Sequence, residues 1–115
     1  MNKEEQLKEL NITIEQAKAI VDKASSLKTL LKDKDFKSVI LDGYFKDEAS
    51  RLALLKGDNG MSKPEDQAYL DRMFNGIGSL HSYFQSIFAM GKNAENAINS
   101  YEETKEEIIK EDIYE

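Results

Sequence analysis

The chain has 115 residues, a mass of 13.1 kDa and a net charge of −6, which fits one domain with a limited hydrophobic core. Hydrophobic residues make up 40% and charged residues 33%, a mixture typical of amphipathic helices with solvated faces. The sequence contains no Cys, so disulfides, thiolate metal ligands and a cysteine nucleophile are excluded.

The negative charge is concentrated near the end of the chain. Residues 92–115 hold 3 basic against 8 acidic residues, whereas residues 1–35 hold 7 of each. Nucleic-acid binding needs clustered Lys and Arg, and no segment supplies such a cluster, so we expect no direct nucleic-acid partner. No apolar run approaches the roughly 20 residues that cross a bilayer, and the charged start is unlike a secretory signal. We therefore expect a soluble protein with no membrane partner.

The first predicted element is a helix over residues 7–32. Its apolar residues alternate in spacing between three and four, a heptad pattern that only Lys28 interrupts: Leu7, Leu10, Ile14, Ala17, Val21, Ala24, Leu31. Ile20 and Leu27 widen this stripe to the face expected of a bundle helix. The charged stretch 32–35 ends the helix.

Residues 36–56 are predicted to form two short helices. Asp35 and Asp47 are the expected N-caps, and Gly43 and Gly57 are the expected stops. A strand over residues 38–41 is the alternative, but no second strand-like run exists to pair with it.

A loop over residues 57–62 is followed by a long helix over residues 63–111. Ser62 and Glu65 have capping-box spacing, and Pro64 is tolerated in a first turn. The heptad alternation then continues from Leu70 to Ile108. Glycines at 76 and 78 could permit a kink there, and we expect a bend at most.

Together these elements predict an all-α fold in a single domain, residues 1–115. We expect an antiparallel helical hairpin or small bundle of two long helices, with the two short helices packed at one end. Pairing of residues 7–31 with residues 87–110 leaves the first half of the last helix to cover the short helices.

No constellation for catalysis or for cofactor binding is apparent. His81 is the single histidine, and without Cys a zinc site would need carboxylates for its remaining ligands, so we expect no metal. Acid–base catalysis by two carboxylates needs a cleft, and acidic neighbours such as Glu102 and Glu103 are expected on solvated helix faces, which do not make one. We therefore predict a non-enzymatic protein that needs no cofactor.

The C-terminal segment is the candidate protein-interaction site. It is acidic and prone to helix, yet carries more apolar groups than a solvated tail needs, and an amphipathic helix of this kind can lie in a groove of a basic partner. The alternative is a frayed terminus. Because the last heptad face exceeds what residues 7–31 can cover, we expect a homo-oligomer or hetero-complex. The predicted contact residues are Ile98, Tyr101, Ile108, Ile109, Ile113 and Tyr114.

Residues 35–52, DFKSVILDGYFKDEASRL, together with residues 77–84, IGSLHSYF, resemble small helical proteins of tailed bacteriophages. Those proteins are mostly uncharacterised and often accompany virion-structure genes. The resemblance implies a virion-structural or virion-assembly protein, located in the virion or the host cytoplasm, whose partner is itself or another phage protein. The alternative is a small phage-encoded regulator that binds and inhibits a host protein. The resemblance carries no functional residues across.

Overall fold

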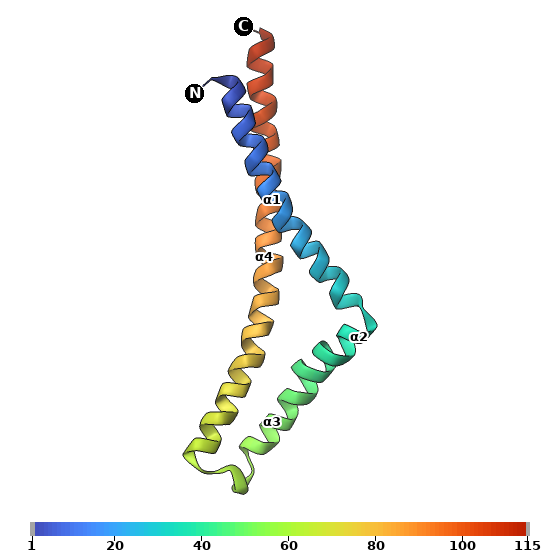
Figure 1. Ribbon diagram of the computed structural model, residues 1–115, viewed down its shortest axis with the longest axis vertical. Helices are drawn as coiled ribbons and strands as arrows, with labels where there is room; N and C mark the ends of the chain where they lie inside the picture. Colours follow the sequence, from blue (N-terminus) through green and yellow to red (C-terminus); the bar gives the residue numbers. More distant parts are fainter. Residues whose placement is uncertain (1, 115) are drawn as a thin grey trace. The chain divides into compact units, whose positions relative to one another are not determined.

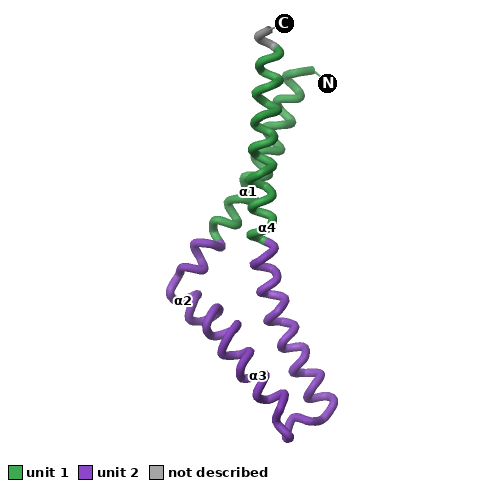
Figure 2. The backbone as a smooth tube through the Cα atoms, turned by 180° about the vertical axis from the view of Figure 1, so that it is seen from behind, with its two compact units in different colours: residues 1–26, 87–115 green, residues 27–86 purple. Residues whose placement is uncertain are grey.

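A computed structural model describes residues 2–114, with the side chains of residues 2–111, and every regular element in that range is helical (Figure 1). The all-α prediction is confirmed. The elements in chain order are α1 (Lys3–Lys32), α2 (Lys34–Phe36), η1 (Lys37–Glu48), α3 (Ala49–Lys56), η2 (Asn59–Met61) and α4 (Pro64–Tyr114). The chain divides into two compact units: unit 1 is Met1–Ser26 with Ile87–Glu115, and unit 2 is Leu27–Ser86 (Figure 2).

Helix α1 begins four residues before the predicted start at residue 7. The Asn2 side chain accepts a hydrogen bond from the Glu5 amide at 2.8 Å, and the Asn2 carbonyl accepts from the Gln6 amide at 3.0 Å. Asn2 is therefore an N-cap, and Asn at this position satisfies amides that have no partner within the helix.

The prediction of two short helices over residues 36–56 is wrong, because one helical run extends from Lys34 to Lys56. Asp33 caps it by accepting from the Phe36 amide at 2.9 Å, so the N-cap lies two residues before the predicted Asp35. Asp47 lies inside η1 and caps nothing. The strand alternative for residues 38–41 is also wrong, since these residues belong to the same run.

Gly43 does not stop a helix, because it lies within η1, a twelve-residue π-helix. No glycine in the described chain has positive φ, so the left-handed conformation that makes Gly a helix stop is absent from this part. A Cβ at Gly43 would lie 2.9 Å from the Ser38 carbonyl oxygen, five residues earlier. The wider π turn brings this carbonyl close, so the absence of a side chain suits this position.

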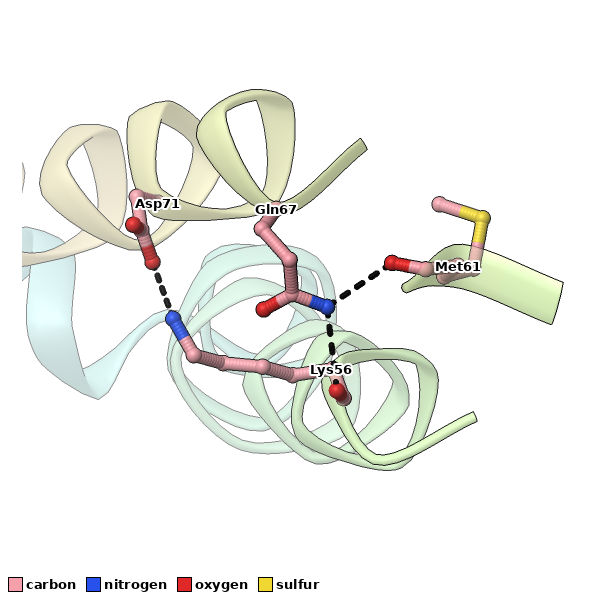
Figure 3. Close-up of polar contacts among 4 residues, drawn as sticks. All are labelled: Lys56, Met61, Gln67 and Asp71. Atoms are coloured by element: carbon pink, nitrogen blue, oxygen red, sulfur yellow. Dashed lines mark hydrogen bonds and ion pairs between the residues drawn. The ribbon is translucent and has the colours of Figure 1, made fainter. Parts of the chain in front are cut away.

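The segment between α3 and α4 is held by side chains as well as by turns. Gln67 of α4 donates its amide N–H groups to the carbonyl of Lys56, at 3.1 Å, and to that of Met61, at 2.8 Å (Figure 3). Lys56 also forms an ion pair with Asp71. These contacts fasten both ends of the connection to the first two turns of α4.

Helix α4 begins at Pro64, and its N-cap is Lys63, whose carbonyl accepts from the amides of Asp66 and Gln67, each at 3.0 Å. Ser62 precedes the N-cap, so the predicted capping box is out of register by one residue. The helix continues through Gly76 and Gly78 without interruption. Gly76 instead serves packing, because a Cβ there would lie 3.3 Å from the Tyr44 hydroxyl.

The core of unit 2 forms between the helical run 34–56 and the first half of α4. Leu52, Leu70 and Ile77 are buried, and Tyr44, Phe45, Ala49, Leu55, Met61 and Phe74 pack against them. Phe45 lies between His81 and Phe84, with ring centroids 5.6 Å and 5.8 Å away. The aromatic residues of this unit therefore pack against one another across the two helical segments.

Candidate protein-interaction groove

The seam of unit 1 has small residues where its two helices come close together. Ala17 on α1 and Ala94 on α4 are buried, together with Ile14 and Ile87. A Cβ at Gly91 would come within 2.5 Å of the Ala24 Cβ. Because small side chains leave little between the backbones, α1 and α4 approach closely here.

Along one side of this seam the two helices leave an open groove. Its first stretch is lined by residues between 13 and 20 of α1 and between 90 and 101 of α4. Its second stretch is lined by residues between 6 and 13 of α1 and between 104 and 108 of α4. The stretches share Thr13. From α1 the lining residues are Gln6, Glu9, Leu10, Thr13, Gln16, Ala17 and Ile20. From α4 they are Met90, Asn93, Ala94, Ala97, Tyr101, Thr104 and Ile108. We call this surface the seam groove.

The seam groove has helical periodicity on both sides. On α4 the positions 90, 94, 97, 101, 104 and 108 alternate between spacings of four and three, the pattern of helices that pack in bundles. At 1.5 Å per residue these positions span about 27 Å. The groove therefore offers a length and a spacing that suit another helix.

Charge is almost absent from the seam groove. Glu9 is the one charged residue among its lining, although charged residues make up 33% of the chain. Thr13 and Thr104 donate their hydroxyl protons to carbonyls four residues earlier in their own helices, at 3.0 Å and 3.1 Å. Their donors are therefore satisfied without a partner, which leaves methyl groups for contact.

Apolar side chains at one end of the groove remain exposed. Ile20 keeps 37% and Met90 keeps 54% of its surface accessible. Exposed apolar groups that gather in a concave, neutral surface indicate a contact site more strongly than scattered ones do.

The predicted contact residues divide between different surroundings. Tyr101 and Ile108 line the seam groove, Ile98 is half-buried outside it, and Ile109 is exposed. The side chains of Ile113 and Tyr114 lie outside the described residues.

The sequence-based prediction missed Met90 and the polar residues of the α1 wall, whereas Leu10, Ala17 and Ile20 of that wall lie on the predicted apolar face. Residues 6, 9, 13, 16 and 20 of α1 already have the alternating three and four spacing, beside the main apolar stripe. The polar character of residues 6, 9, 13 and 16 concealed this second pattern.

Unit 1 carries the whole net charge of the chain. Its two segments hold 7 basic and 13 acidic residues, whereas unit 2 holds 9 of each. Exposed carboxylates gather near the end of α4, at Glu102, Glu103, Glu106 and Glu107. The neutral groove is thus set in a strongly acidic unit.

Unit 2 contains the alternative candidates, and we interpret them as structural. His81 packs edge-on against Phe45, and no group of three metal-ligating side chains occurs among the described residues. Hydrogen bonds from the Arg51 guanidinium lower the pKa of Glu48, and the same bonds raise the pKa of Arg51. Both lie on one surface turn, so we interpret them as a local ion pair.

None of the described helices is long and apolar enough to cross a membrane. The chain matches no protein-family model, no curated protein and no solved structure.

Proposed function

We propose that this protein is a non-enzymatic structural or assembly component that acts through helix-mediated contacts with other protein chains. The observation that carries the proposal is the seam groove, whose fourteen lining residues include one charge although the unit around it is acidic. A neutral groove with heptad spacing suits a helix as its occupant, because such a helix can bury Ile20 and Met90 without leaving an unpaired charge.

The proposal includes the layout predicted from the sequence, in which the long helices pair antiparallel and the shorter helical run packs at one end. Each unit by itself supports this layout. In unit 1 the start of α1 lies along the second half of α4 (Figure 2). In unit 2 the run 34–56 packs against the first half of α4 through Leu52 and Leu70.

The resemblance of residues 35–52 and 77–84 to small helical phage proteins supports a role in the particle of a tailed bacteriophage, either in the virion or during assembly in the host cytoplasm. Quantitative mass spectrometry of purified particles and of assembly intermediates tests this role. We expect the chain at a fixed copy number in one of them. Its absence from both would contradict the proposed function.

A second candidate is a small phage-encoded regulator that binds and inhibits a host protein. The acidic end of α4 supports it, because exposed carboxylates at 102–107 favour a basic partner and fast, salt-dependent association. A regulator would be absent from particles and would bind a host protein with an affinity that falls as salt rises. A structural component would instead be present in particles or in assembly intermediates.

A further inference from the structure

We infer that the occupant of the seam groove is a second copy of this chain, packed groove to groove about a two-fold axis that crosses the helices. This inference rests on the proposed function and names its partner. The two copies of α4 then run antiparallel, and the axis lies level with Asn99. The interface is isologous, so the same residues serve both copies.

The α4 wall of the groove is complementary to itself in this arrangement. Its six heptad positions are symmetric about residue 99, so Ala97 of one copy lies level with Tyr101 of the other, and Met90 lies level with Ile108. A small residue faces a large one at the centre, and two apolar residues meet at each end. Large-to-small pairing of this kind fills an interface without voids.

Charge selects this orientation over the parallel one. Two parallel copies would bring together the carboxylates of Glu102, Glu103, Glu106 and Glu107 from both chains. The antiparallel arrangement places them at opposite ends, level with residues 91–96 of the other copy, where one basic residue, Lys92, and one acidic residue, Glu95, offset each other in charge. Like charges opposed across an interface disfavour the wrong pairing.

Two copies of the seam groove can also meet with little charge repulsion, unlike the rest of unit 1. A unit with 7 basic and 13 acidic residues repels a second copy wherever acidic faces meet. The seam groove is neutral except for Glu9, so contact there avoids that repulsion.

Sedimentation equilibrium of the full-length chain tests this inference. We expect a dimer for the wild type, and Ile20→Glu or Met90→Glu should raise its dissociation constant by about 100-fold or more, because each change places two carboxylates in the interface. Both side chains are exposed within one copy, so helix content measured by circular dichroism should stay unchanged. Phe88→Glu is the matched control.

Phe88 has 38% of its surface exposed, close to the value for Ile20, but is absent from the groove lining. Two residues from Met90 on the same helix, it points to the other side of α4. Phe88→Glu should leave the dimer intact. A wild-type chain that is monomeric at all concentrations, or equal weakening by all three substitutions, would overturn the inference.

The distance between two spin labels, one on each copy, shows whether the two copies of α4 run antiparallel or parallel. The chain has no native Cys, so Ile109→Cys provides a single attachment point outside the groove. In the antiparallel dimer two labels lie twenty residues apart in register, or about 30 Å along the helix axis. A parallel dimer would place them side by side, and that result would contradict the proposed axis.

These outcomes separate the inference from the function on which it rests. A monomeric chain found in particles, with its groove photocrosslinked there to a different protein, overturns the second copy and keeps the structural role. A dimeric chain absent from particles and from assembly intermediates overturns the phage structural role and keeps the dimer.

Discussion

Gly91 of α4 lies so close to Ala24 of α1 that a Cβ at position 91 would be 2.5 Å from the Ala24 Cβ. Carbon atoms do not approach to this distance without a shift of the backbone. The contact therefore sets the separation of the two helices in unit 1, and with it the width of the seam groove.

Replacing Gly91 by Ala is expected to destabilise the protein. The substitution gains about 1 kcal/mol of helix propensity, but overpacking in a close contact costs about 1–3 kcal/mol. Gly78→Ala is the matched control, because a Cβ at Gly78 meets nothing within 4 Å. It should gain up to about 1 kcal/mol in urea unfolding. Equal stabilisation by both substitutions would show that the helices are not in contact at Gly91.

The core of unit 2 should depend on Leu52 and Leu70, which are 1% and 0% exposed. Truncation of either to Ala is expected to cost about 2–5 kcal/mol, since it removes buried methyl groups and leaves a cavity. Leu54, on the same helix as Leu52, is 79% exposed. Leu54→Ala should change the free energy of unfolding by less than about 0.5 kcal/mol. Similar losses at Leu52 and Leu54 would contradict the assigned face of α3.

Gln67 should hold the connection between α3 and α4. Gln67→Ala removes the hydrogen bonds to the carbonyls of Lys56 and Met61 and is expected to cost about 1–2 kcal/mol. Amide hydrogen exchange in residues 56–62 should accelerate in this variant. Gln85→Ala, in the same helix, provides the control, and unchanged exchange in the Gln67 variant would contradict the role.

The Glu48–Arg51 pair should make a pH-dependent contribution to the stability of the folded chain. The hydrogen bonds from Arg51 lower the folded-state pKa of Glu48, so the stabilisation is fully present above the ordinary Glu pKa of about 4.3 and is lost as pH falls through the lowered value. In Arg51→Ala, an NMR titration should find the Glu48 pKa returned toward its ordinary range. Arg72→Ala should leave the Glu48 titration as in the wild type, and a shift there would point to a general charge effect.

Periodicity predicted the long helices because each buries one apolar stripe over many turns. Ile14, Ala17, Leu70 and Ile77, all on the predicted stripes, are buried. The structural roles of the glycines were predicted less well. Gly43 and Gly76 looked like a stop and a kink, but both accommodate close contacts inside helices, and only the three-dimensional neighbour distinguishes these uses.

The groove was harder to predict because its distinguishing property is the near absence of charged residues. Tyr101 and Ile108 were recognised as surplus apolar groups, whereas Thr13 and Gln16 carry polar atoms and were assigned to no face. Their contribution to a neutral surface depends on the pairing of α1 with α4, which no local pattern encodes.

The concentration dependence of thermal unfolding tests most directly whether the chain completes its burial against another copy. Association in the folded state stabilises by mass action, so the wild-type midpoint should rise with protein concentration. The midpoint of Met90→Glu should be lower and independent of concentration, and that of Phe88→Glu should rise as in the wild type. A wild-type midpoint that stays constant from low micromolar to near-millimolar concentration would contradict the account.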